Sequence, residues 1–112
     1  LDRSSAASDV YKRQVQTYAE SFGYGVVREM VGHGIGRKMH EDPEVPNYFT
    51  GRRGPRLEPG MALAIEPMIT LGSPDICLDE NQWTVSTIDE KPAAHYENTT
   101  ILTKNGLEIL TL

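Results

Sequence analysis

The sequence predicts an α+β fold in which one helix is followed by mostly antiparallel strands. Apolar residues recur at helical spacing within residues 15–22, whereas short runs of apolar and β-branched residues dominate after residue 25. Asn105 and Gly106 separate two such runs near the carboxyl end, and both residue types tolerate positive φ, which is typical of a hairpin. A chain of 112 residues forms one small domain or part of a larger one.

The helix is expected because Val15, Tyr18, Ala19 and Phe22 fall at positions i, i+3, i+4 and i+7. This spacing places the four side chains on one apolar face. Gly23 follows directly and supplies a signal for the end of the helix. We therefore expect a helix that precedes all of the strands.

The strands are separated by a long irregular loop, expected at residues 43–60 because proline and glycine recur there. Pro67 interrupts an otherwise apolar run and predicts a strand end, a bulge or a sheet edge, because proline has no N–H to donate to a ladder. The predicted strands are residues 26–31, 61–70, 83–88, 99–103 and 107–111.

Residues 1–14 are predicted to be a non-native extension. They contain no initial methionine and no hydrophobic period, and they resemble translated adapter sequence. A native flexible terminus is the alternative interpretation. Under either interpretation the native protein is expected to begin further upstream, and residues 15–112 are expected to be the native part.

Composition excludes several classes of protein. The net charge of −5 argues against nucleic-acid binding, and the only dense basic cluster, Arg52, Arg53 and Arg56, is expected to be a solvated loop surface. A single cysteine, Cys77, excludes an internal disulfide and fits a reducing compartment. No apolar run approaches the roughly 20 residues that span a bilayer. We therefore expect a soluble cytoplasmic protein that contacts neither nucleic acid nor membrane.

Three candidate metal ligands lie in three separate segments. His33 stands among glycines, Glu66 ends an apolar run, and Glu97 follows an aromatic residue. Each has a simpler interpretation: an incidental histidine in a glycine bulge, a strand terminus that reaches water, and a surface acid on an edge strand. Alternation would place Glu66 on the face of small side chains, where a buried carboxylate requires a compensating cation. His95 shares the expected strand face of Glu97 and could act as its hydrogen-bonding partner.

Two carboxylates and an imidazole suit hard or borderline divalent ions. A carboxylate that bridges two ions supports the activation of water for hydrolysis. His40, which lies past the glycine turn, could donate a hydrogen bond to a developing oxyanion, although it could also be a loop histidine without a partner. Together these residues predict a metal-dependent hydrolase.

Two nucleotide-binding motifs and one zinc-binding motif are excluded at the glycine-rich segment. A phosphate loop fails because the Gly-Lys-Ser/Thr ending is absent, and the dinucleotide fingerprint fails because Arg37 replaces its third glycine. The zinc-helix motif fails because Pro43 breaks the helix and Glu44 occupies the place of the second histidine.

Six short motifs, in their order and spacing, resemble the carboxyl-terminal half of type I methionine aminopeptidase. They are Gly-His-Gly-Ile-Gly-Arg, His-Glu-Asp-Pro, Leu-Glu-Pro-Gly-Met, Ile-Glu-Pro-Met, Trp-Thr-Val and His-Tyr-Glu-Asn-Thr, at residues 32–37, 40–43, 57–61, 65–68, 83–85 and 95–99. The resemblance runs from about Val15 to Leu112. One motif would be weak, but six in register are highly specific.

The resemblance implies a pita-bread α+β fold with two divalent ions, whether cobalt, manganese, iron or zinc, that removes the initiator methionine from nascent proteins. It implies that His33 is an imidazole ligand, that Glu66 is a carboxylate ligand and proton acceptor, and that Glu97 bridges the ions. His40 resembles the histidine that steadies the substrate amide and the tetrahedral intermediate.

The resemblance also implies that Trp83 and Met39 line the methionine pocket, although the family often has an aromatic residue in place of Met39. The implied partners are the amino termini of nascent polypeptides near the ribosome exit, and the full-length enzyme is implied to be a monomer.

The family also needs two aspartates and a histidine from its amino-terminal half. No histidine precedes His33, and the two aspartates that do, Asp2 and Asp9, lie in the segment predicted to be a non-native extension. Residues 15–112 are therefore expected to be a partial catalytic domain, and the chain alone is expected to have little or no peptidase activity. Two alternatives remain: a proline-directed pita-bread aminopeptidase and a non-catalytic interaction module. Met68 and the Trp-Thr-Val segment favour the methionine enzyme.

Overall fold

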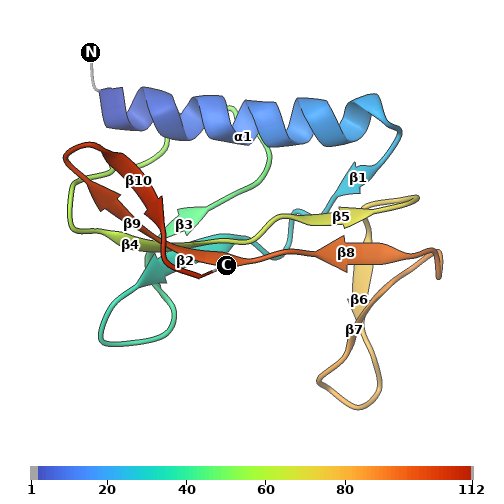
Figure 1. Cartoon of the computed structure of the whole chain (residues 1–112). Coiled ribbons are helices and arrows are strands. Elements are labelled where there is room, and N and C mark those ends of the chain that lie inside the picture. The colour runs from blue at the N-terminus through green and yellow to red at the C-terminus, as the bar shows by residue number, and fades with distance from the viewer. Residues whose placement is uncertain (1–2, 112) are drawn as a thin grey trace.

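The computed structural model describes residues 3–111, and it confirms the expected α+β arrangement (Figure 1). Within that range one helix, α1 (Arg3–Ser21), precedes ten short strands. The strands form three antiparallel sheets, and α1 lies along one side of them in Figure 1. Leu1, Asp2 and Leu112 lie outside the described residues.

The larger sheet contains five strands in the order β10-β9-β4-β2-β3. Every neighbouring pair is antiparallel, and β4 lies at the centre, between β9 and β2. The strands are β2 (Gly32–Ile35), β3 (Glu41–Val45), β4 (Ala62–Ile65), β9 (Asn98–Thr103) and β10 (Gly106–Ile109).

A three-stranded sheet in the order β1-β5-β8 continues from the larger one, and β6 pairs with β7 in a separate ribbon. The ribbon projects away from the two other sheets in Figure 1. The strands are β1 (Gly25–Val26), β5 (Met68–Thr70), β8 (Ala93–His95), β6 (Ile76–Leu78) and β7 (Val85–Thr87).

The chain crosses between the two main sheets at two adjacent places. Glu66 and Pro67 separate β4 from β5, and Tyr96 and Glu97 separate β8 from β9. The predicted single strand at residues 61–70 is therefore wrong, whereas the strand end expected at Pro67 is confirmed. Because β4 pairs with β9 and β5 pairs with β8, the two crossovers lie side by side.

Several other strand predictions need correction. Residues 27–31 are not a strand, and the glycine-histidine segment that they were expected to lead into is itself strand β2. The loop expected at residues 43–60 begins later, because β3 extends to Val45. The strand predicted at 83–88 is reduced to β7. Strands β6 and β8 were not predicted, because three residues show no period.

The carboxyl-terminal hairpin is confirmed, with Gly106 paired to Thr103 and Ile109 paired to Thr100. Gly106 has a φ of 120°, a conformation that glycine adopts without a steric penalty. Positive φ is not found at Asn105, so glycine alone supplies the unusual backbone conformation of this turn.

The apolar face predicted for helix α1 is only partly buried. Of its expected apolar face, Ala19 is buried, but Tyr18 is 71% exposed and Phe22, just past the helix, is 58% exposed.

The helix runs without a break across residue 14, the expected boundary of the non-native extension, and Lys12 is only 2% exposed. Arg13 stacks over the ring of Phe49, with its guanidinium carbon 3.8 Å from the centroid. That residues 1–14 are non-native stays a prediction.

The buried core lies where α1, β1 and the centre of the larger sheet meet. Leu63 and Ala64 of β4 are 2% and 0% exposed, so the strand that leads into Glu66 is held on both sides. The other buried apolar residues are Ala19, Val26, Val27, Val45 and Met68. No helix within residues 3–111 is long and apolar enough to cross a membrane.

Candidate metal centre

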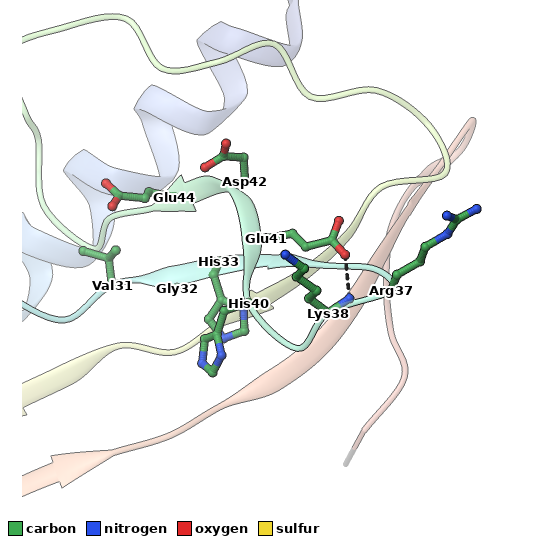
Figure 2. A pocket seen from close by; sticks show the side chains of 9 residues that line it. All are labelled: Val31, Gly32, His33, Arg37, Lys38, His40, Glu41, Asp42 and Glu44. Atoms are coloured by element: carbon green, nitrogen blue, oxygen red, sulfur yellow. Dashed lines mark hydrogen bonds between the residues drawn. The ribbon is translucent and has the colours of Figure 1, made fainter. Parts of the chain in front are cut away.

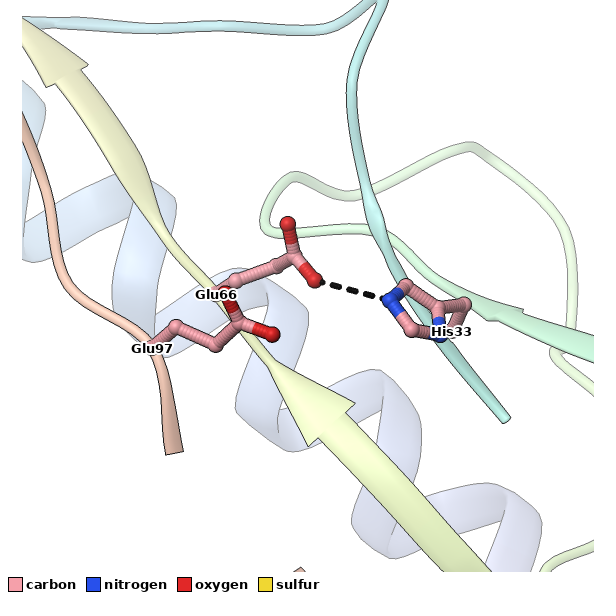
Figure 3. A group of neighbouring side chains, drawn as sticks. All are labelled: His33, Glu66 and Glu97. Atoms are coloured by element: carbon pink, nitrogen blue, oxygen red, sulfur yellow. Dashed lines mark ion pairs between the residues drawn. The ribbon is translucent and has the colours of Figure 1, made fainter. Parts of the chain in front are cut away.

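The three candidate ligands meet at the two crossovers between the sheets. The possible ligand atoms of His33, Glu66 and Glu97 all lie within 4.8 Å of one another. The Nε2 atom of His33 lies 3.1 Å from the Oε2 atom of Glu66. Figure 3 shows the three side chains turning toward a common space from three separate segments. The sequence placed these residues in three distant motifs, and folding brings them together.

Strand β2 presents His33 to this space. His33 pairs with Ala64 of β4, two residues before Glu66. Its Nδ1 atom lies 2.9 Å from the carbonyl oxygen of Gly34. A carbonyl only accepts, so this contact assigns a proton to Nδ1, while Nε2 faces Glu66. A histidine that donates from Nδ1 in this way is oriented to bind a metal ion through Nε2.

The glycine before His33 is required by the packing of the strands. A Cβ atom at Gly32 would collide with the carbonyl oxygen of Ala64 on the neighbouring strand. The packing of β2 against β4 therefore explains why glycine stands at this position. A larger residue would push the imidazole away from Glu66.

Glu66 is buried, which rules out the simpler interpretation that it reaches water at a strand end. It is 8% exposed, and its Oε2 atom is buried without a hydrogen bond. Burial raises the pKa of this carboxyl group, and the nearby carboxylate of Glu97 raises it further, against the opposing effect of the imidazoles. A buried carboxylate oxygen without a hydrogen bond costs several kcal/mol, which a bound cation would offset.

Glu97 and His95 complete the cluster from the second crossover. Their side chains are 47% and 45% exposed, so this side of the cluster is open to solvent. The Nε2 atom of His95 lies 3.5 Å from Oε1 of Glu66 and 4.0 Å from Oε2 of Glu97. The suggested partnership between His95 and Glu97 therefore extends to Glu66.

His40 also lies at this site. Its ring centroid is 4.2 Å from that of His33, with the planes inclined by 45°. Figure 2 shows both imidazoles on the same side of the β2–β3 hairpin, beside a depression with several charged side chains. The depression is lined by Val31, Gly32, His33, Arg37, Lys38, His40, Glu41, Asp42 and Glu44.

Met39 and Trp83 remain exposed, by 73% and 86% respectively. Met39 belongs to the β2–β3 loop but does not line the depression beside His40. Trp83 lies in the turn of the β6–β7 ribbon, where its backbone N–H donates to Oδ1 of Asn81. Their role in a methionine pocket stays a prediction.

Asn47 supports the site and was not singled out from the sequence. It is fully buried, and its Nδ2 atom donates to the backbone carbonyl of Glu66 at 3.3 Å. The hydroxyl of Tyr11 donates to Oδ1 of Asn47 at 2.7 Å, and burial raises the pKa of Tyr11 to about 12. Neither partner is near in sequence, so no local pattern could have revealed this arrangement.

The donor set fits a divalent ion. An imidazole nitrogen and a carboxylate oxygen face each other at 3.1 Å, and a second carboxylate adjoins them. A sequence model of metallopeptidase family M24 matches residues 4–104. The chain belongs to metallopeptidase family M24.

Relatives within this family are named methionine aminopeptidases. The chain is 61% identical over 98 residues to methionine aminopeptidase of Clostridium acetobutylicum. The aligned region covers 88% of this chain and 39% of that protein. It is 50% identical over 97 residues to methionine aminopeptidase 1 of Bacillus subtilis, covering 87% of this chain and 39% of the relative. The chain thus spans about two fifths of the length of the curated relatives it matches.

Solved structures agree with this assignment. Methionine aminopeptidase of Thermotoga maritima superposes with a TM-score of 0.86 at 47% identity, covering 93% of this chain and 41% of that one. The enzyme of Rickettsia prowazekii gives a TM-score of 0.86 at 42% identity, covering 94% and 42%. The expectation of part of a pita-bread fold is confirmed.

Proposed function

We propose that this chain contributes to a methionine aminopeptidase, a metal-dependent enzyme that hydrolyses the peptide bond after an amino-terminal methionine. The observation that carries the proposal is the buried Oε2 atom of Glu66, which accepts no hydrogen bond and faces the Nε2 atom of His33 beside Glu97. The names of the relatives supply the substrate class. The proposed setting is the cytoplasm, and the proposed substrates are the amino termini of nascent polypeptides.

His33, Glu66 and Glu97 would hold divalent ions, with Glu97 as the carboxylate shared by two of them, and bound ions would supply Lewis acidity toward a carbonyl and toward water. His33 and Glu66 supply an imidazole and a carboxylate to the same space. Glu66 is also proposed to accept a proton from the attacking water.

His40 is proposed to donate a hydrogen bond to the substrate carbonyl oxygen as negative charge develops on it. Its ring lies against His33, so it is close to any carbonyl held at the ligand cluster. Met39 and Trp83 are proposed to contact the methionine side chain. Both are exposed, which leaves them accessible to a substrate or to further chain packed over them.

For the 112-residue chain itself, we propose binding of one divalent ion with little or no peptidase activity. The described residues bring together one imidazole and two carboxylates as ligands. The resemblance implies two further aspartates and a histidine, and a second ion held without them would lack most of its ligands. Titration calorimetry with Co²⁺ tests this stoichiometry, with Glu66→Gln as the variant and Glu108→Gln, on exposed β10, as a matched control.

The substrate class is tested with a chimera. The matched residues of this chain would replace their counterparts in the Clostridium acetobutylicum enzyme, to which they are 61% identical. We expect the chimera to release methionine from a Met-Ala-Ser peptide and to leave Xaa-Pro peptides intact. An active parent enzyme with a folded but inactive chimera would contradict the proposal. Cleavage of Xaa-Pro peptides alone would favour the proline-directed alternative.

A further inference from the structure

The carboxylate of Glu66 lies between two imidazoles. Its Oε2 atom is 3.1 Å from Nε2 of His33, and its Oε1 atom is 3.5 Å from Nε2 of His95. The two oxygens thus have different neighbours. The oxygen near His33 is the buried atom that accepts no hydrogen bond.

The sheet, rather than a chance meeting of surface side chains, fixes the position of His95. Its backbone pairs with Met68 at the end of β8. The next residue, Tyr96, donates its N–H to the carbonyl of Pro67 at 3.2 Å. Pro67 directly follows Glu66, so two backbone contacts hold the His95 segment against the Glu66 crossover. The imidazole of His95 is about half exposed, but its point of attachment is rigid.

His95 also lies between the two carboxylates. Its Nε2 atom is 4.0 Å from Oε2 of Glu97 as well as 3.5 Å from Glu66. The two acidic groups repel each other, and an N–H between them offsets that repulsion. Without His95, this attraction between the two carboxylates and a common neighbour would be lost.

Resting on the proposed metal-dependent function, we propose that His95 is a positioning residue that holds Oε1 of Glu66 and keeps Glu97 beside it. Oε2 of Glu66 then stays directed at the space shared with His33. His95 is not itself among the three residues whose ligand atoms lie within 4.8 Å of one another. It acts through the carboxylates, as hydrogen-bonding partners of ligands do at metal sites.

The test is the Co²⁺ affinity of the 112-residue chain, measured by titration calorimetry together with the visible absorption spectrum of bound Co²⁺. We expect His95→Ala to weaken binding by about 10- to 100-fold. His95→Gln keeps an N–H donor at a similar reach and is expected to recover most of the affinity. Its Co²⁺ spectrum should match the unmodified chain, because no ligand is lost. Ala94→Ser, at the neighbouring position of β8, is the control for general disturbance of the strand.

The outcomes separate the inference from the proposed function. If the unmodified chain binds one ion and His95→Ala binds it equally well, the inference is wrong and the metal site stands. If His95→Gln is as weak as His95→Ala and its Co²⁺ bands shift, His95 is a ligand and the positioning role is wrong. If the unmodified chain binds no ion, both proposals are wrong for this chain.

Discussion

Glu66 and Glu97 occupy neighbouring crossovers between the same two sheets. Each lies in a two-residue break, Glu66 between β4 and β5 and Glu97 between β8 and β9. Ile65 pairs with Asn98 on one side of the breaks, and Met68 pairs with His95 on the other. The strands are paired both before and after the two breaks. The carboxylates of Glu66 and Glu97, two like charges, are therefore held close together at a place where neither strand ladder continues. This arrangement places two candidate ligands side by side without relying on flexible loops.

The first prediction concerns the pH dependence of stability in the metal-free chain. The pKa of Glu66 is raised by burial and by Glu97 above its ordinary value of 4.5, so the folded state holds this proton more tightly than the unfolded state. The stabilising effect is present below the ordinary pKa and is lost as pH rises through the raised value. Urea denaturation should therefore give a falling free energy of unfolding from acidic to neutral pH.

Glu66→Gln should flatten this decline, because the substituted side chain does not titrate. Glu108→Gln, on exposed β10, should leave it unchanged. Saturating Co²⁺ should also reverse the loss at neutral pH in the unmodified chain, because an ion that binds only the folded state stabilises it. An equal decline in Glu66→Gln and in the unmodified chain would contradict the assignment to Glu66.

A second prediction follows from the contact between β2 and β4. In Gly32→Ala, the added Cβ would meet the carbonyl oxygen of Ala64, so β2 must shift and carry His33 with it. We expect destabilisation of about 1–3 kcal/mol, as for other overpacked sites, together with weaker Co²⁺ binding. Urea denaturation and titration calorimetry measure the two effects.

Gly51→Ala is the matched control for this substitution. Gly51 has a φ of 80°, and a methyl group added there would have no atom within 4 Å, so alanine strains only a remote loop. It should cost about 1–2 kcal/mol of stability and leave the Co²⁺ affinity unchanged. Equal ion affinity in both variants would show that the position of His33 does not depend on Gly32.

The candidate ligand residues could be singled out from the sequence because their local surroundings are unusual. A histidine between glycines and a glutamate before a proline stand out in any composition. The Asn-Gly pair likewise identified the β9–β10 hairpin. The sequence could not show that the strand break containing Glu66 adjoins the break containing Glu97. That neighbourhood depends on pairings between residues far apart in the chain, such as Met68 with His95.

The missed features share this dependence on distant contacts. Strands of two or three residues, such as β1 and β8, are too short for any period to be visible. The apolar spacing of Tyr18 and Phe22 indicated a helix correctly, but a period cannot show what covers the face, and both side chains are exposed. Asn47 joins Tyr11 and Glu66, which are 36 and 19 residues away, so its role is visible only in the folded chain.

A third prediction tests this support by Asn47. Asn47→Ala removes the donor to the Glu66 carbonyl and leaves the partly buried hydroxyl of Tyr11 without its acceptor. We expect a loss of about 1–3 kcal/mol in urea denaturation, because the groups left behind are unsatisfied. Tyr11→Phe should cost less, since only one hydrogen bond is lost. Asn81→Ala, an exposed turn substitution, is the control, and an equally small effect at Asn47 would contradict a structural role.

The last prediction separates His40 from the ligands. The ring of His40 lies 4.2 Å from that of His33, yet its nitrogens are not part of the cluster within 4.8 Å. If it stabilises charge on the substrate oxygen, His40→Ala in the chimera should lower kcat by about 10²–10³-fold, as for the loss of an oxyanion donor. The Co²⁺ affinity and the KM for Met-Ala-Ser should change little. His33→Ala, in contrast, should lose ion binding and activity together, so parallel losses in His40→Ala would instead place His40 among the ligands.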